Sequence, residues 1–318
     1  MNQETICVLG GTGFVGRHLA NRLAQRGYHV RILSRRPERH RALGINPEIQ
    51  VLRANVHDPD DLLSNLAGTT AVINLVGILN DTGKQGAGFR QAHVELPQKL
   101  VAACTASGVS RVLHMSALHA SANEQHSQYL RTRGEGEDLL HAAADQGLVV
   151  TSFRPSVIFG QGDSLFNRFA SLLKITGPVF PLACPDSRLA PVWVSDVVEA
   201  MCRSLDAATG GERLELCGQE IMTLQEIVTF IRDTLGLKRL IIPLPDSLGF
   251  TQAFVCDYLV PGKPFSLDNF RSLTVASVCT NNGFARLGIK PREFRAAAHQ
   301  ILDAREPQLT RIRRISGR

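Results

Sequence analysis

The sequence predicts an α/β fold in which a doubly wound parallel sheet is followed by a smaller C-terminal domain. Apolar runs of strand length alternate with segments of helical periodicity over the first half of the chain, a pattern typical of parallel sheets. Gly10, Gly13 and Gly16 stand between the first strand and the first helix. Beyond Pro155 the alternation ends and proline-rich stretches begin, so we expect a second unit there.

The first strand–helix–strand unit covers residues 5–36. Residues 6–9 form a short apolar run, apolar residues then recur at three- and four-residue steps (15, 19 and 23), and Gly27 is placed to end the helix. A glycine turn in this position lets a nucleotide pyrophosphate approach the backbone, and the helix N-terminus attracts its charge. The unit therefore predicts a dinucleotide site at Gly10, Thr12, Gly13, Phe14, Val15 and Gly16.

The end of the second strand, expected over residues 28–33, indicates which dinucleotide binds. Ser34, Arg35 and Arg36 stand there, and the first acidic residue is Glu38. In such folds an acidic residue contacts the ribose 2′-hydroxyl of NAD, whereas an arginine accommodates the 2′-phosphate of NADP. We therefore favour NADP(H) over NAD(H), with a solvated basic turn as the alternative. Arg17 is either a second phosphate contact or a surface residue.

The remaining elements follow in order, each bounded by turn or capping residues. We expect strands over residues 49–53, 71–76, 111–115, 148–153 and 212–216. We expect helices from Pro59 with Asp58 as cap, over 89–107, from Asn123 or Ser127 to about 145, over 165–174, after Trp193 with Ser195 or Asp196 as cap, and over 224–235 with Thr223 as cap. Residues 178–191 show no regular pattern.

These elements predict a nucleotide-binding domain over residues 1–160, to which residues 191–217 return. Residues 161–190 and 218–303 form the smaller domain, and residues 304–318 are a basic tail. The 318 residues are 44% hydrophobic and 20% charged, as in ordinary soluble proteins. No apolar run approaches the roughly 18 residues that span a bilayer, and residues 1–4 leave no room for a signal peptide. We expect a cytoplasmic protein.

The cysteines and charges exclude several kinds of site. The seven cysteines are scattered and form no Cys-x-x-Cys pair, so we expect reduced, buried thiols and neither a zinc site nor a disulfide framework. Residues 305–318 carry five arginines and one glutamate, which is +4 of the net charge of +6. The nearly neutral remainder argues against nucleic-acid binding. The tail is either a solvated end or a contact for an anionic phospholipid surface.

Several motifs make the chain resemble an extended, epimerase-like short-chain dehydrogenase/reductase. They are the glycine turn at 10–16, Met115-Ser116, the segment from Tyr129 through Arg133 to Glu137, residues 154–160 and residues 191–197. Within that superfamily the chain is most similar to the family of complex I alpha subunit 9 and its free-standing bacterial relatives. Leu244-Pro245, residues 261–264 and residues 287–291 support this subgroup, and the resemblance covers about residues 5–302.

The resemblance implies NADPH on a Rossmann-type sheet, with the smaller α/β domain closing over the nicotinamide as a lid. By position, Asn55 and Val56 would flank the adenine. Leu75, Val76 and Gly77 would lie along the cofactor, and Arg154, Pro155 and Val157 would pass the nicotinamide edge. Each of these residues also has a purely structural interpretation, because strand ends are packed in any α/β fold.

Catalysis in this superfamily uses a tyrosine and a lysine four residues later, where the ammonium group lowers the pKa of the phenol. Here Tyr129 is paired with Arg133, which keeps the charge and can donate to the ribose but is not interchangeable with lysine. Ser116 is the candidate third member, or else a packed residue, because the expected hydroxyl position is nearer Leu118. His114, His119 and His126 are alternative proton relays or structural residues.

Two functions therefore remain open. One is an NADP(H)-binding protein of the complex I alpha subunit 9 type, linked to respiratory-chain or quinone metabolism, with a peripheral position at the inner membrane as an alternative to a free cytoplasmic one. The other is an active NADPH-dependent reductase or epimerase that uses Tyr129 on a quinone or sugar-nucleotide-like substrate. The apolar stretches 248–254 and 258–260 are either ordinary core, which we favour, or a contact for a protein partner, a lipid surface or a prenyl tail. No metal site is indicated.

Overall fold

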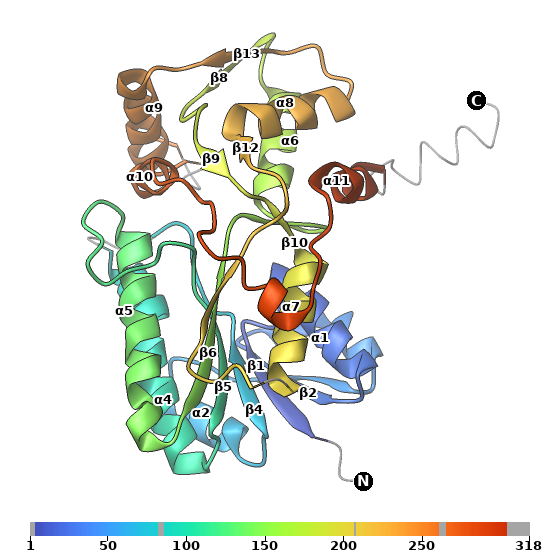
Figure 1. Ribbon diagram of the computed structural model, residues 1–318, viewed down its shortest axis with the longest axis vertical. Helices are drawn as coiled ribbons and strands as arrows, with labels where there is room; N and C mark the ends of the chain where they lie inside the picture. Colours follow the sequence, from blue (N-terminus) through green and yellow to red (C-terminus); the bar gives the residue numbers. More distant parts are fainter. Residues whose placement is uncertain (1–3, 82–85, 207, 261–264, 304–318) are drawn as a thin grey trace, which may run out of the picture.

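The computed structural model describes residues 4–81, 86–206, 208–260 and 265–303, and the expected basic tail lies outside them. The described elements form two lobes (Figure 1). The large lobe contains the main sheet and the helices beside it. The small lobe, at the top of Figure 1, follows Phe159 and contains most of the later elements.

In the described part of the chain, seven strands form one parallel sheet in the order β11-β6-β5-β4-β1-β2-β3. They are β1 (Thr5–Leu9), β2 (His29–Ser34), β3 (Ile49–Arg53), β4 (Ala71–Asn74), β5 (Arg111–Met115), β6 (Val149–Pro155) and β11 (Arg213–Leu216). Strand order reverses at β1, which pairs with both β2 and β4. The predicted α/β fold with a doubly wound parallel sheet is confirmed.

Helices cover both faces of this sheet. On one face lie α1 (Phe14–Gln25) and α7 (Val194–Asp206), and on the other α2 (Pro59–Leu66), α4 (Leu96–Ser107) and α5 (Gln128–Ala142). Each face has its own buried core, which contains Ile32 and Val197 on the first and Leu62 and Val112 on the second. Burial on both faces explains why the strands are continuous apolar runs.

Capping residues set the helix boundaries much as the sequence predicts. Asp58 accepts hydrogen bonds from the amides of Asp60 (3.0 Å) and Asp61 (3.2 Å) at the start of α2. Of the two candidates for the cap of α5, Ser127 holds the position and accepts from the amide of Leu130. Gly108 ends α4 with a positive φ of 74°, a conformation that glycine adopts without strain.

The single helix expected over residues 89–107 is divided into three parts. A short helix α3 (Ala87–Arg90) and a π-helical segment η3 (Gln91–Glu95) precede α4. Gly136 of α5 lies against the carbonyl oxygen of His93, and a Cβ atom at that position would overlap it. The π segment therefore accompanies a close approach of α5, and it brings the rings of His93 and Tyr129 to 5.6 Å between centroids.

The small lobe is built from α6 (Leu165–Ile175), β8 (Val179–Leu182), α8 (Leu224–Thr234), β13 (Leu240–Pro243), α9 (Asp246–Tyr258), α10 (Leu267–Leu273) and α11 (Phe294–Asp303). Its core contains a cluster of aromatic rings, in which Phe159, Phe166 and Phe294 lie 5.1–5.6 Å apart between centroids. Thr223 caps α8, as predicted, and the structure adds a capping box with Glu226. Phe284 and Leu287, within the range expected for the small domain, pack in the core of the large lobe instead.

Short elements complete the described chain. They are η1 (Pro37–His40), η2 (Leu43–Ile45), η4 (Ala143–Gln146), β7 (Ile158–Phe159), β9 (Arg188–Leu189), β10 (Val192–Trp193), β12 (Met222–Thr223) and η5 (Ala285–Leu287).

Two local predictions are wrong. Residues 178–191 are not irregular, because β8 pairs with β13 and β9 pairs with β12. Prolines 181 and 243 are tolerated there because each two-stranded sheet consists only of edges. In addition, α7 begins at Val194, so Ser195 and Asp196 lie inside its first turn. The carboxylate of Asp196 instead accepts a hydrogen bond from the amide of Arg292 at 2.7 Å.

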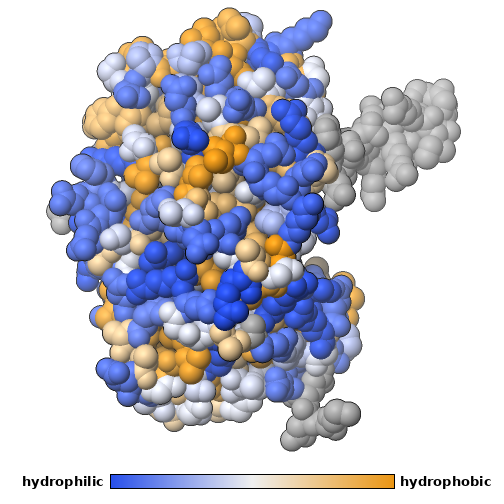
Figure 2. Space-filling view, viewed as in Figure 1, coloured by the Kyte–Doolittle hydropathy of each residue, from blue (hydrophilic) through white to orange (hydrophobic). Residues whose placement is uncertain are grey.

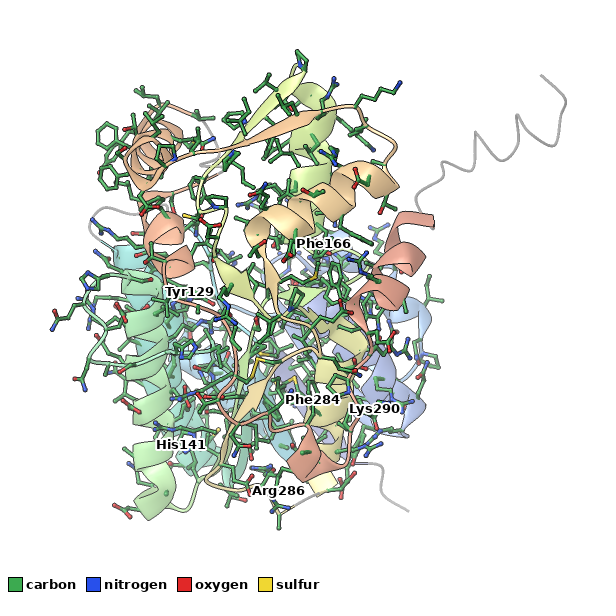
Figure 3. All side chains as sticks on the ribbon, turned by 45° about the horizontal axis from the view of Figure 1, so that its top comes forward. Tyr129, His141, Phe166, Phe284, Arg286 and Lys290 are labelled. Carbon is green, nitrogen blue, oxygen red and sulfur yellow. A yellow bond between two sulfur atoms is a disulfide. The ribbon has the colours of Figure 1, made fainter. Side chains whose placement is uncertain are left out.

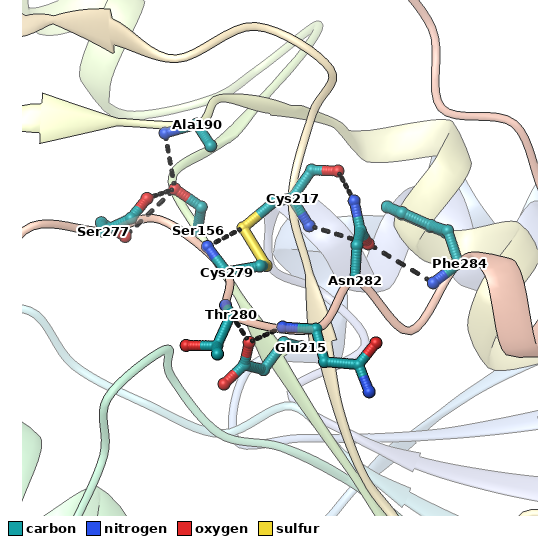
Figure 4. Close-up of a disulfide and its surroundings, with 10 residues drawn as sticks. Ser156, Ala190, Glu215, Cys217, Ser277, Cys279, Thr280, Asn282 and Phe284 are labelled. Atoms are coloured by element: carbon teal, nitrogen blue, oxygen red, sulfur yellow. Dashed lines mark hydrogen bonds between the residues drawn. A yellow bond between two sulfur atoms is a disulfide. The ribbon is translucent and has the colours of Figure 1, made fainter.

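The expectation of reduced thiols is wrong for one pair, since Cys217 and Cys279 form a disulfide (Figure 4). It joins the segment after β11 to a loop 62 residues away in sequence. The same loop is held by Asn282, which donates to the carbonyl oxygen of Cys217 at 2.8 Å. Cys7, Cys104, Cys184 and Cys202 are free and buried, as expected.

Candidate functional site

The glycine turn is built by tight backbone packing at the end of β1. Gly10 has a positive φ of 76°, and the amide of Gly13 donates to its carbonyl oxygen at 3.0 Å. A Cβ atom on Gly16 would lie 2.5 Å from the Cα atom of Gly11, so α1 can approach the turn only because residue 16 is glycine. Gly13, the N-cap of α1, has no side chain to cap the first amides of the helix. The turn therefore offers the backbone geometry that an anionic phosphate requires.

A cavity of about 640 Å³ opens from this turn towards the small lobe. Its lining includes many of the predicted residues: Gly10, Gly13, Phe14, Val15, Gly16, Leu75, Gly77, Ser116, Tyr129, Arg133, Pro155 and Val157. The C-terminal ends of β1, β4, β5 and β6 thus contribute to one space. This is the edge at which ligands bind in open parallel sheets, beside the point where strand order reverses.

Other predicted residues lie outside this lining. Arg35 and Arg36 are exposed directly after β2, and Ser34 is buried, with its hydroxyl accepting from the amide of Arg36 at 3.3 Å. Asn55 and Val56 follow β3, and the amide of Asn55 donates to Asp61 at 2.6 Å. Because β2 and β3 run parallel to β1 in the same sheet, these residues stand at the same edge of the sheet.

The remaining non-lining residues are Thr12, Val76 and Arg154. The carbonyl oxygen of Thr12 accepts from Nε of Arg17 at 2.9 Å. Arg17 is the residue for which we considered a second phosphate contact. Its guanidinium group therefore lies against the glycine turn.

Tyr129 lies at the end of α5 that faces the small lobe (Figure 3). Arg133, four residues later, lies on the same face of the helix. The guanidinium carbon of Arg133 is 5.6 Å from the centroid of the Tyr129 ring. Arg133 is only 7% exposed, and it donates to the carbonyl oxygens of Val76 (3.2 Å) and Met115 (2.9 Å). It occupies the space beside Gly77 that a Cβ atom at residue 77 would need. Arg133 thus binds the ends of β4 and β5 together while it places a positive charge beside Tyr129.

Ser116 is engaged by a buried charge cluster. Its hydroxyl donates to the carboxylate of Glu137 at 2.5 Å, and the Glu137 side chain is 0% exposed. Arg154 (3.0 Å) and Arg213 (3.3 Å) form ion pairs with the same carboxylate. A buried carboxylate needs such partners, so the structure accounts for Ser116 and Arg154 as members of this cluster. Leu118, the alternative position for a hydroxyl, also lines the cavity.

The histidines considered as relays differ in their surroundings. Burial, and then the charge of Arg133, lowers the pKa of His114 to about 3, and its Nδ1 contacts the amide nitrogen of Asn74. His119 lines the cavity and has a positive φ of 60°, which is unusual for a residue other than glycine. His126 is exposed, and its backbone amide donates to Glu124.

Sequence reasoning missed His93. Burial, and then the charge of Arg133, lowers its pKa far below the ordinary value. Its Nε2 accepts from the amide of Ile78 at 3.2 Å, so Nδ1 carries the proton and donates to Thr132 at 3.0 Å. His93 is therefore a neutral residue that orders the wall behind Tyr129.

Sequence reasoning also missed Asp268 of α10. Its carboxylate accepts from the hydroxyl of Ser127 (3.1 Å) and from the amides of Gln128 (2.7 Å) and Tyr129 (3.1 Å). A negative charge at a helix N-terminus is favourable, and here the small lobe supplies it to the helix that carries Tyr129. Nothing in the sequence pattern indicates a contact between residues about 140 positions apart.

The apolar stretch on α9 is not ordinary core, contrary to our expectation. Leu259 is 73% exposed, Tyr258 68% and Phe254 48%, and Leu248, Phe250, Val255 and Val260 are also exposed. Figure 2 shows hydrophobic surface over the top of the small lobe. The opposite side of α9 packs against the small lobe, and its buried residues are Gly249 and Ala253. A three-turn helix with this much exposed apolar surface is uncommon on a soluble protein that has no partner.

The model of the NAD dependent epimerase/dehydratase family matches residues 6–217. NADH dehydrogenase [ubiquinone] 1 alpha subcomplex subunit 9, mitochondrial, of Arabidopsis thaliana is 26% identical over 93% of this chain and 76% of that protein. Ceramide reductase of Caulobacter vibrioides is 29% identical over 76% of this chain and 74% of that protein. These relatives agree with the resemblance seen in the sequence.

A solved structure shows the same fold. UDP-glucuronic acid 4-epimerase from Bacillus cereus, in complex with UDP-glucuronic acid and NAD, superposes with a TM-score of 0.66 at 18% identity, over 85% of this chain and 99% of that chain.

Among the described residues, no helix is both long and apolar enough to span a bilayer.

Proposed function

The chain belongs to the NAD dependent epimerase/dehydratase family, and on that premise we propose that it binds NADP(H) across the glycine turn. The observation that carries this proposal is the turn itself, which opens directly into the cavity beside Tyr129. Arg35 and Arg36 are exposed at the end of β2, where a 2′-phosphate would lie. Glu38, the first acidic residue after them, is paired with Arg53 at 2.9 Å.

Direct titration tests this proposal. NADPH and NADH are added separately to the purified full-length protein, and binding is followed through the fluorescence of the reduced nicotinamide. We expect saturable binding of both nucleotides with tighter binding of NADPH. Equal affinity for the two would remove the NADP preference, and a folded protein that binds neither would remove the proposal.

We further propose that the protein has a role like that of complex I alpha subunit 9. It would be a nucleotide-binding component linked to the respiratory chain or to quinone metabolism. The similarity to the Arabidopsis subunit supports the link. The exposed apolar face of α9 provides a surface for such an assembly. In this role the nucleotide stabilises the fold by binding only the native state. Replacing Tyr129 by phenylalanine would then leave cellular function intact, whereas a bulky residue at position 13 would remove it.

We also propose that the protein lies in the cytoplasm and associates peripherally with the inner membrane. The basic tail, residues 304–318, would contact anionic lipid there. The arginines of the tail are the chemistry that such a surface attracts. Deleting residues 305–318 should release the protein from vesicles that contain phosphatidylglycerol, while neutral vesicles should bind neither form. Unchanged co-sedimentation after the deletion would rule out this contact.

A second candidate is reduction of a carbonyl compound, with Tyr129 as proton donor. The specific observation in its favour is that Tyr129 and the charge of Arg133 lie together in the cavity, next to the turn that would hold the nucleotide. The similarity to ceramide reductase is consistent with such chemistry. NADPH consumption measured with a short-chain ubiquinone analogue and with a UDP-4-keto sugar tests the two substrate classes, because each offers a carbonyl group that hydride can reduce. Consumption with neither would leave the binding role alone.

A further inference from the structure

The cavity extends beyond the glycine turn into the small lobe, where most of the residues in its walls are apolar. Ser164 and Thr176, at the two ends of α6, both line it. Since a helix rises about 1.5 Å per residue, this part extends roughly 18 Å along α6. Its walls include Leu165, Phe169, Leu172, Phe180, Phe265 and Leu273. An elongated apolar compartment therefore adjoins Tyr129.

These apolar side chains are not simply the core of the small lobe. Leu165, Phe169, Leu172, Phe265 and Leu273 pack against the buried core, yet each is only partly buried and lines the cavity. The walls come from separate elements, α6, β8 and α10 among them. The compartment thus has apolar surface that a ligand would remove from water.

The charges of the lining argue against a nucleotide-diphosphate group in this compartment. Among the described residues that line it, the small lobe contributes one cation, Arg168, and no carboxylate. A diphosphate is usually held by several charged and hydrogen-bonding donors. Several polar side chains of the lining already donate to backbone carbonyl oxygens. Thr176 donates to that of Leu172 at 2.9 Å and Ser272 to that of Asn269 at 2.9 Å. The side-chain amide nitrogen of Gln252 donates to that of Pro181 at 3.3 Å.

Helix α9 forms a thin wall between the compartment and the outer surface. Gln252 and Cys256 line the cavity, while Phe254, Val255 and Tyr258 of the same helix are exposed. The outer surface of this wall is therefore largely apolar, and no charged residue occurs between positions 247 and 256.

We infer that this compartment binds the long aliphatic chain of a second ligand, whose polar head lies near Tyr129. The inference deepens the proposed function and rests on it, because the nucleotide would occupy the glycine-turn end of the same cavity. It assigns the substrate to molecules with an extended apolar chain, and not to sugar nucleotides.

The test uses the full-length protein with NADPH bound, and cis-parinaric acid, a fatty acid whose fluorescence rises in apolar surroundings. We expect saturable binding that decanoic acid competes away and UDP-glucose does not. Leu172→Gln places a polar amide in the compartment. It should lower the affinity for cis-parinaric acid by about tenfold or more. Ile175→Gln is the matched control on α6, because Ile175 is 79% exposed and does not line the cavity. Val255→Gln is the control for adsorption to the outer face of α9.

Probe affinity that falls with Leu172→Gln, and stays unchanged in both controls, supports the inference. Absence of saturable binding, displacement by UDP-glucose, or equal loss in Val255→Gln would overturn it. NADPH affinity is measured in every variant. A protein that binds NADPH normally but not the probe contradicts only this inference, whereas a protein that does not bind NADPH contradicts the proposed function.

Discussion

The carboxylate of Asp268 accepts a hydrogen bond from the backbone amide of Tyr129 at 3.1 Å, and so ties the small lobe to the start of α5. Asp268→Asn keeps the shape of the side chain but removes its charge from the helix N-terminus. We expect the free energy of unfolding to fall by about 1–2 kcal/mol, measured by urea denaturation. Asp145→Asn is the control, because Asp145 is an exposed carboxylate. Equal stability of wild type and Asp268→Asn would show that the contact contributes nothing.

Gly16→Ala tests the packing of the glycine turn. The added Cβ atom would lie 2.5 Å from the Cα atom of Gly11, so the turn must shift. We expect a loss of stability of about 1–3 kcal/mol together with weaker nucleotide binding. Gly44→Ala is the matched control, because nothing lies within 4 Å of a Cβ atom there. Denaturation and NADPH titration of both variants provide the measurement, and a Gly16→Ala protein with normal NADPH affinity would contradict the proposed role of the turn.

Arg35→Ala tests the preference for NADP(H). If the guanidinium group binds the 2′-phosphate, its removal should lower the affinity for NADPH by about tenfold or more. The affinity for NADH should not change. Arg41→Ala, at another exposed arginine after β2, should affect neither nucleotide. The two affinities are compared by fluorescence titration at fixed ionic strength. An equal loss for both nucleotides would contradict the assignment of Arg35 to the phosphate.

Tyr129→Phe separates the two candidate functions. In the reductase, loss of the proton donor should lower the rate of NADPH oxidation by about a hundredfold or more, with NADPH affinity retained. In the binding protein, the same substitution should change neither nucleotide affinity nor function in the cell. Tyr258→Phe, on the exposed face of α9, is the control for the loss of a phenol hydroxyl elsewhere.

The buried histidines predict acid sensitivity. The pKa of His114 is lowered to about 3 in the folded protein, below its ordinary value of about 6.5. As the pH falls below 6.5, the unfolded chain takes up a proton that folded His114 does not, so stability present at neutral pH is lost towards pH 3. The expected slope from this one group is about 1.4 kcal/mol per pH unit. His114→Gln should flatten the dependence of the unfolding free energy on pH, whereas His126→Gln, at an exposed position, should not. Parallel curves for wild type and His114→Gln would contradict this origin.

Much of the large lobe follows from local sequence signals. The strands are short apolar runs, the helices have an apolar periodicity, and capping residues such as Asp58, Gly108 and Thr223 mark their ends. The glycine turn is equally local, since its shape depends on residues within seven positions of one another. These features depend on backbone conformations and on burial patterns that each segment expresses by itself.

The candidate site is less accessible from sequence, because its geometry depends on contacts between distant segments. Tyr129 and Arg133 can be placed on one helical face, yet only the structure shows that Arg133 is held by the carbonyl oxygens of Val76 and Met115. Likewise, Ser116 is a plausible hydroxyl in the sequence, and its hydrogen bond to Glu137 appears only in the fold.

The parallel α/β architecture, the glycine turn and the family to which the chain belongs all follow from the amino-acid sequence alone. Packing between distant segments is what pairs Cys217 with Cys279, places the carboxylate of Asp268 at the first amides of α5 and leaves the apolar face of α9 exposed. The difference lies in how far apart in the sequence the interacting residues are. Periodicity and capping act between residues a few positions apart, whereas a disulfide, a cap from another lobe or an uncovered face depends on where whole elements pack.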